Sequence, residues 1–395
     1  MINLRQFKFW VFTLEGLNAL ASAYFFNYVF FFLQKHHGFG PYDNLRFGAL
    51  NGFLFVFSSL YGGKYAQRHG YFSGLRLGFI LMILALTFGY FLSTVLGLCI
   101  ALSVWTFGMC FTWPALEGMV CEKENHASLP KMLAIYNIVW AGGGAIAYFS
   151  GGWVQLHLGS KSIFWVPVIL HGIQLVIVSS LRRRLPRGVD SLAALPNDDA
   201  EHIQEASPKV TEGFQTLAWV ANPFAYIAQS AIIPLIPELA QRLHLSAAAA
   251  GVFCSIWLFA RLFSFVILGL WTGWHYRFGW LISCYLLLGA AFCGILLFTN
   301  LWWLALLQII FGLCVGLVYY SSLYYSMNAS QTLSEHGGMH EAALGVGLFA
   351  GPAIGASALW LVPGQPHGAV YAVAVTLLCG GVALVKLKPK ITRTN

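Results

Sequence analysis

The sequence has few charged side chains, because Asp, Glu, Lys and Arg together make up 9% of its 395 residues. A soluble domain carries about 25%. Hydrophobic residues account for 58%, and the mean hydropathy is +0.70. So little charge cannot cover the surface of a soluble fold of this length. The composition therefore predicts an integral membrane protein whose apolar surface faces lipid.

Motifs for nucleotide, metal and disulfide chemistry are also missing. The sequence has no Gly-x-x-x-x-Gly-Lys-Ser/Thr phosphate loop, which argues against ATP-driven transport, and no His-Glu-x-x-His pair of a metalloprotease. Its eight cysteines form no Cys-x-x-Cys motif or Cys/His cluster. We therefore expect no metal site, no cofactor, no catalytic residue and no enzymatic activity.

Apolar segments of membrane-spanning length dominate what is present. One crossing takes about 20 helical residues. By that measure the chain holds twelve segments, which predict an all-α integral membrane fold: 7–34, 47–66, 76–95, 97–120, 131–153, 162–181, 214–237, 247–270, 279–298, 301–326, 340–361 and 368–387. The first segment is too long for the core of a cleavable signal peptide.

A charged stretch over residues 182–213 interrupts the apolar pattern after the sixth segment. It holds eleven charged residues and reads as an exposed linker, with a short helix expected around 198–205. It divides the chain into an N-terminal six-helix bundle, residues 1–181, and a C-terminal six-helix bundle, residues 214–395.

The placement of Lys and Arg predicts the orientation. With a cytoplasmic N-terminus, 17 of the 22 basic residues fall on the cytoplasmic side and four fall outside. This positive-inside bias puts both termini and the linker in the cytoplasm of a multi-pass protein in the cell's inner (plasma) membrane. The net charge of +8 then reflects topology and not nucleic acid binding. Lipid is the expected environment, and a monomer the expected state.

An internal repeat relates the two halves. A shift of 209 residues aligns "QRHGYF", residues 67–72, with "YRFGWL", residues 276–281. Arg68 then meets Arg277, and Gly70 meets Gly279, in the turn after the second segment of each half. The alignment predicts two pseudosymmetric bundles.

The first of these turns resembles the signature of the major facilitator superfamily, Gly-x-x-x-Asp-Arg-x-Gly-Arg-Arg. Gly63, Arg68 and Gly70 match it, whereas Gln67 replaces the usual acid. The resemblance implies a transporter of twelve helices in which these residues, together with Arg277 and Gly279 of the repeat, form a conformational gate.

Two acids inside the first half are candidates for proton coupling. A charge in hydrocarbon costs at least about 2.5–3.5 kcal/mol, so such a side chain should face a cavity or a partner. Glu15 lies in the first segment, where an interhelical salt bridge is the structural alternative. Glu117 lies near the end of the fourth, where its side chain can also snorkel to the interface.

Arg261 lies near the centre of the eighth segment. It stays protonated, so it cannot relay protons, but it can bind a substrate carboxylate or phosphate, or pair with an acid such as Glu15. His340 and Glu341 open the eleventh segment, either as part of the cytoplasmic gate or as an ordinary helix start. For His171, in the sixth segment, we expect a structural hydrogen bond.

The resemblance further implies that helices one, four, seven and ten line a central cavity. With Arg261, the substrate-binding candidates are then the polar and aromatic residues of these helices: Asn18, Asn27, Trp105, Trp113, Asn222, Tyr226, Gln229, Gln308, Tyr319 and Tyr320. Aromatic faces beside hydroxyls and amides suit sugars, nucleosides or aromatic acids.

These features predict a secondary active transporter that moves a small organic solute by alternating access, with proton-coupled uptake as the preferred mode. One alternative is proton-driven efflux of amphipathic compounds. Another is a membrane sensor that does not transport.

Overall fold

The computed structural model describes residues 4–122, 124, 128–184, 208–328 and 333–392. Within these residues the chain is helical, with short turns and no strand. The helices are α1 (Leu4–His37), α2 (Pro41–His69), α3 (Tyr71–Phe91), α4 (Val95–Cys121), α5 (Leu129–Leu158), α6 (Ser162–Arg184), α7 (Pro208–Arg242), α8 (Ala247–Cys254), α9 (Ile256–Leu270), α10 (Phe278–Leu297), α11 (Leu301–Asn328), α12 (Leu333–Leu361) and α13 (Gly368–Thr392).

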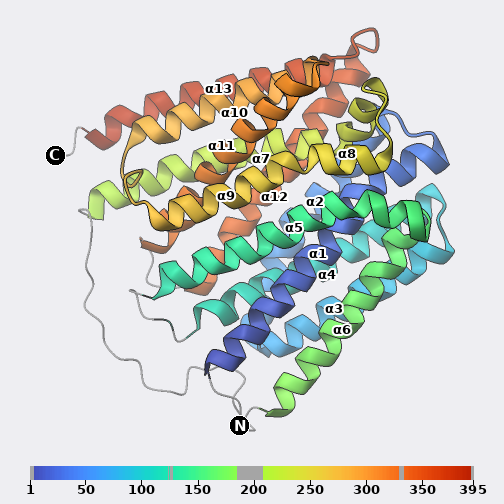
Figure 1. Cartoon of the computed structure of the whole chain (residues 1–395). Coiled ribbons are helices and arrows are strands. Elements are labelled where there is room, and N and C mark those ends of the chain that lie inside the picture. The colour runs from blue at the N-terminus through green and yellow to red at the C-terminus, as the bar shows by residue number, and fades with distance from the viewer. Residues whose placement is uncertain (1–3, 123, 125–127, 185–207, 329–332, 393–395) are drawn as a thin grey trace.

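Figure 1 shows helices α1 to α6 gathered on one side of the bundle and helices α7 to α13 on the other. The predicted all-α fold of two six-helix halves is confirmed. The end of α6, the start of α7 and the two chain ends lie at the same end of the bundle, which we call the predicted cytoplasmic side. The helix expected around 198–205 lies outside the described residues, and the domain boundaries at 181 and 214 stay predictions.

The thirteen helices amount to twelve crossings because α8 and α9 form one span, Ala247–Leu270, broken at Ser255. Eleven of the spans are apolar enough to be recognised from composition, and α2 is the twelfth. α2 buries glycines and polar side chains such as Asn51, Ser58 and Ser59. These buried glycines and polar side chains make the sequence of α2 less apolar than that of the other spans.

The turn between α2 and α3 is shorter than the sequence suggests. Arg68 and His69 still belong to α2, and Gly70, at φ 83°, is the whole connection. A positive φ favours glycine, which explains Gly70. Its sequence partner Gly279 lies inside α10 instead, and the positive φ of the second turn falls on Tyr276. The two turns therefore share the Arg and Gly of the repeat but not the backbone conformation.

The two halves meet along α2 with α12 and along α5 with α8 and α9. A Cβ on Gly52 would collide with the backbone of Leu348 and Phe349 in α12. Pro352 lacks an N–H, so the Leu348 carbonyl has no helical donor at this contact. Gly152 of α5 lies equally close to the start of α8. These approaches lie toward the side opposite the chain ends.

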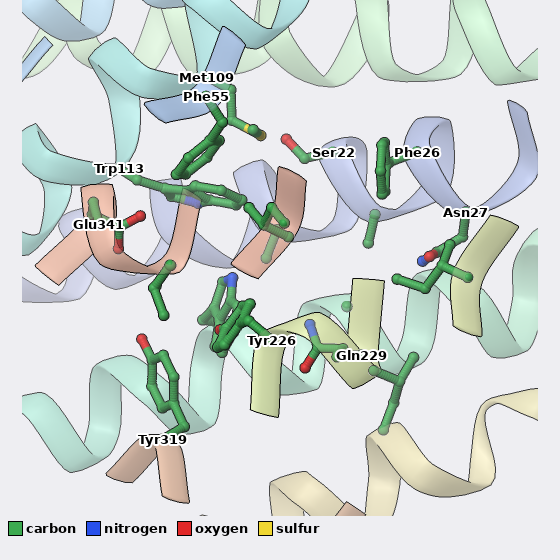
Figure 2. A pocket seen from close by; sticks show the side chains of 18 of the residues that line it. Ser22, Phe26, Asn27, Phe55, Met109, Trp113, Tyr226, Gln229, Tyr319 and Glu341 are labelled. Atoms are coloured by element: carbon green, nitrogen blue, oxygen red, sulfur yellow. The ribbon is translucent and has the colours of Figure 1, made fainter. Parts of the chain in front are cut away.

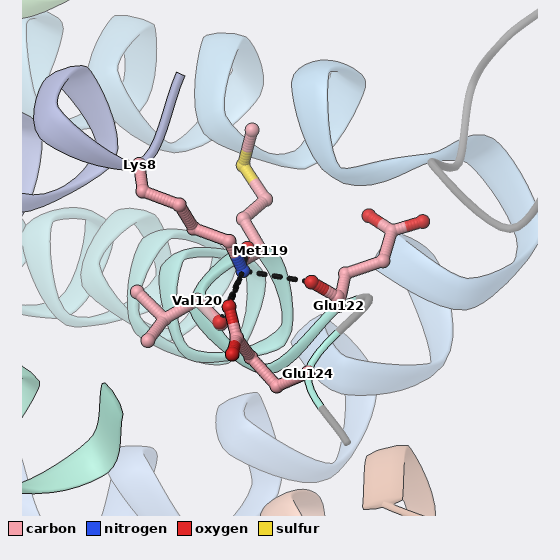
Figure 3. A network of polar contacts seen from close by, with 5 residues as sticks. All are labelled: Lys8, Met119, Val120, Glu122 and Glu124. Carbon is pink, nitrogen blue, oxygen red and sulfur yellow. Dashed lines mark hydrogen bonds and ion pairs between the residues drawn. The ribbon is translucent and has the colours of Figure 1, made fainter. Parts of the chain in front are cut away.

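At the predicted cytoplasmic side, α1 is fastened to the end of α4 by Lys8 (Figure 3). The buried ammonium donates to the carbonyl oxygens of Met119, Val120 and Glu122, at 3.2 Å for Met119 and 2.7 Å for Glu122, and pairs with the Glu124 carboxylate at 3.3 Å. A cation at a helix C-terminus satisfies carbonyls that have no intrahelical partner. Lys8 therefore links α1 to the end of α4 within the N-terminal half.

Candidate functional site

A cavity of about 160 Å³ lies between the two halves. Helices α1, α2, α4 and α5 line it from the first half, and α7, α9, α11 and α12 from the second (Figure 2). Nine of its 24 lining residues are aromatic. The four helices predicted to line the site do so, and α2, α5, α9 and α12, which join the halves, line it as well. Of the predicted helices, α11, the tenth crossing, contributes only Tyr319.

Seven of the eleven predicted substrate residues line this cavity: Asn27, Trp105, Trp113, Tyr226, Gln229, Arg261 and Tyr319. Figure 2 shows Tyr226 of α7 between Gln229 and Tyr319, and Asn27 at the far end of the cavity from Glu341.

The other four predicted residues are buried away from the cavity lining. Asn18 is packed between α1 and α4, where its Nδ2 donates to Oγ1 of Thr112 at 3.1 Å. Asn222 and Gln308 are 1% and 2% exposed within their bundle half. Tyr320 packs against Phe265 and Trp274. None of these four side chains belongs to the cavity lining.

Arg261 is 5% exposed and lies in the cavity wall. Its Nη1 donates to Oε1 of Gln229 at 3.2 Å, and its guanidinium lies 4.5 Å from the ring centroid of Trp140 and 5.3 Å from that of Trp257. No carboxylate of the described residues pairs with it. The predicted alternative of an Arg261–Glu15 pair is not formed.

Three acids gather at the cavity's predicted cytoplasmic end. Glu117 of α4 and Glu341 of α12 line the cavity, and Glu15 of α1 lies fully buried behind it. Glu15 interacts with the Tyr136 side chain and electrostatically with both other acids. None of the three forms an ion pair within the part of the chain that the structure describes. The salt-bridge alternative for Glu15 is thus not formed, and Glu341 joins a cluster that spans both halves.

Five aromatic residues of the cavity escaped the sequence analysis, and three of them carry a polar group: Tyr136 and Trp140 of α5 and Trp257 of α9. A signal for them existed. Trp257 precedes Arg261 by four residues, and Tyr136 precedes Trp140 by four, so each pair shares a helix face. The packing of α5 against α9 is a tertiary contact, which the spacing of residues along the sequence cannot predict.

The remaining predicted gate residues lie away from the cavity. Arg68 and Arg277 are exposed at the predicted cytoplasmic side, Gly63 lies within α2, and Gly279 faces open space. The His340 side chain lies outside the described residues.

His171, which we expected to be structural, has its Nδ1 2.8 Å from Oε1 of Gln174, whose Nε2 donates to the Leu14 carbonyl at 2.9 Å. This chain of contacts fastens α6 to α1 and confirms a structural hydrogen bond.

The comparison with protein families gives a match for the C-terminal part of the chain. Residues 218–395 match the family model described as the Major Facilitator Superfamily. No curated protein matches the sequence.

Solved structures share the fold over nearly the whole chain. The human organic anion transporter MFSD10 aligns at a TM-score of 0.67 and 12% identity, over 97% of this chain and 100% of that one. A POT family transporter in complex with a thioalcohol-conjugated peptide gives 0.72 and 12%, over 98% and 96%. The nucleoside transporter NupG gives 0.68 and 12%, over 98% and 99%.

The cavity is enclosed by both halves of a twelve-crossing bundle. Residues 218–395, just under half of the chain, match the Major Facilitator Superfamily model, and the whole chain shares the fold of the solved transporters. At 12% identity the solved structures share the fold alone, and their substrates, which differ from one another, do not transfer.

Proposed function

We propose that this protein takes up a small organic solute by alternating access and couples that movement to protons. Glu15, Glu117 and Glu341 are the proposed proton-binding groups, and the aromatic cavity beside them is the proposed solute site. The observation that carries this proposal is the gathering of three acids without a basic partner in the described part of the chain.

A cluster of acids in a poorly hydrated site favours proton binding, because several negative charges cannot be held close together without compensation. Glu341 belongs to the second half, and the other two acids belong to the first. Repulsion between deprotonated carboxylates therefore acts across the interface that alternating access must open and close. Proton binding removes the repulsion and permits the halves to approach.

The test is solute-evoked proton movement into proteoliposomes loaded with a pH-sensitive dye. Sugars, nucleosides, amino acids and aromatic carboxylates are added in turn, and protein-free liposomes correct for passive entry of weak acids. We expect one class to acidify the lumen. Glu15→Gln should abolish accumulation driven by a pH gradient while leaving counterflow exchange.

Three outcomes would overturn the proposal. Solute movement without proton movement would refute coupling. Accumulation only in the opposite direction, scored in vesicles of known orientation, would establish efflux. A protein that binds solutes and shows no flux with any of them would support the sensor alternative.

A further inference from the structure

The buried guanidinium of Arg261 lacks the partner that such a group ordinarily has. A charge removed from water needs an opposite charge or several hydrogen bonds. Arg261 has one neutral acceptor, the Gln229 amide oxygen, and its Nε has none. The two tryptophan rings stabilise the charge through their faces. Stacking leaves the N–H groups at the edge of the guanidinium available for an anion.

Other donors around the same cavity are also unsatisfied. The indole N–H groups of Trp105, Trp113 and Trp257 have no hydrogen-bond partner, and all three residues line the cavity. An indole nitrogen donates only and a guanidinium donates only. Buried donors are normally paired, so these three indole N–H groups and the Nε–H of Arg261 lack an acceptor within reach. A ligand that supplies several oxygen acceptors would satisfy them.

The walls select the body of that ligand. Phe26 and Phe55 line the cavity together with the tryptophans and Tyr226, and nine of the 24 lining residues are aromatic. Its volume of about 160 Å³ is close to that of a cavity of about 150 Å³ that holds benzene. A single ring therefore fits, with room for few further atoms, whereas a disaccharide or a peptide requires a larger cavity.

We propose that the cavity binds small aromatic carboxylates, with the carboxylate on Arg261 and the ring between the aromatic walls. This inference rests on the proposed transport function and names its substrate class. Arg261 and the acid cluster have opposite effects on the binding of the anion. The guanidinium attracts the anion, whereas deprotonated Glu117 and Glu341, in the same cavity wall, repel it. Proton binding to these acids therefore favours loading of the substrate.

Binding to the purified full-length protein tests the proposal without any need for transport. The probe is 4-hydroxybenzoate, followed by quenching of tryptophan fluorescence and by thermal shift, with 4-hydroxybenzamide as the neutral control of the same shape. We expect the acid to bind at least about tenfold more tightly than the amide, because hydrogen bonds to charged groups contribute about 1.5–3 kcal/mol. Cyclohexanecarboxylate reports separately on the preference for a ring with a flat face.

Variants of Arg261 locate the anion. Arg261→Gln should weaken 4-hydroxybenzoate about 100-fold and leave the amide unchanged, and Arg261→Lys should fall between. Trp105→Phe, which removes the indole N–H and keeps a six-membered aromatic ring, should weaken only the acid. Equal affinity for acid and amide, or an Arg261→Gln variant that binds the acid as wild type does, would overturn the proposal.

The inference and the proposed function fail separately. Selective binding of the acid without proton movement in proteoliposomes would keep the substrate class and refute coupling. Proton movement evoked by a neutral solute, with no selective binding of the acid, would do the reverse.

Discussion

The two halves of the bundle each bury a basic side chain, and they do so in opposite ways. Lys8 in the first half is surrounded by acceptors: three backbone carbonyls and the Glu124 carboxylate. Arg261 in the second half has one neutral acceptor and two aromatic rings. Lys8 fastens two helices of the same half, whereas Arg261 lies in the wall of a cavity that both halves share.

The difference separates a structural cation from a proposed ligand-binding one. A buried charge costs free energy until its hydrogen-bonding groups are matched. For Lys8 the fold supplies the matching groups, so removing Lys8 should damage the fold. For Arg261 the fold leaves the N–H groups of a buried charge short of acceptors, so removing it should damage ligand binding and little else.

Loss of the structural cation has the largest expected effect on stability. Lys8→Met should lower the free energy of unfolding by about 3 kcal/mol, because the α4 carbonyls and Glu124 lose their donor. The measurement is thermal unfolding in detergent, with Arg261→Met as the matched variant. We expect Arg261→Met to unfold at or above the wild-type temperature. Equal destabilisation by the two substitutions would erase the proposed difference.

Supplying the missing acid should make Arg261 resemble Lys8. In Gln229→Glu the carboxylate replaces the amide that contacts Arg261 at 3.2 Å, so the cation gains an internal ion pair. We expect higher thermal stability and about a tenfold loss of 4-hydroxybenzoate affinity, because the ligand now competes with a built-in carboxylate. Gln229→Met is the control without an acceptor. Unchanged affinity in Gln229→Glu would argue that the anion binds elsewhere.

The acids of the same cavity should make binding depend on pH. As pH rises, Glu117 and Glu341 lose protons, the cavity becomes more negative, and an anion is repelled more strongly. Affinity for 4-hydroxybenzoate should therefore fall with rising pH, and Glu341→Gln should reduce that fall by about threefold. Titration of fluorescence quenching between pH 5 and pH 8 measures both, with 4-hydroxybenzamide as the ligand that should show no such dependence. A pH profile identical in wild type and Glu341→Gln would exclude Glu341.

The smallest effect compares the two glycines that the repeat aligns. Gly70→Ala should destabilise the protein by about 1 kcal/mol, because φ 83° is unfavourable for any residue with a Cβ. Gly279 lies in α10 with open space around it, so Gly279→Ala should be neutral or slightly stabilising. Thermal unfolding of the two variants side by side decides the matter. Equal losses would mean that the turns are equivalent after all.

Much of the fold could be predicted because lipid imposes a one-dimensional rule. Each crossing must be long and apolar, so the segments were found from composition. α2 is less apolar than the others, and its predicted ends lie several residues inside those of the structure. Arg261, Glu15 and Glu117 were found by the same rule, as charges inside apolar runs. The gathering of Glu341 with Glu15 could not be predicted, because these residues lie in different halves and no local pattern relates them.

Composition and hydropathy are enough to predict that the chain is helical, spans a membrane and repeats its architecture, since hydrophobic burial and backbone hydrogen bonding in lipid allow little else. They also show which side chains are too polar to face lipid. Which of these side chains have partners depends on how the helices pack. Lys8 is matched because α1 meets the end of α4, and Arg261 is left short of acceptors because α5, α7 and α9 bring it aromatic rings and a single amide oxygen. Contacts between distant segments, which depend on how the helices pack, therefore make one cation structural and the other a candidate binding site.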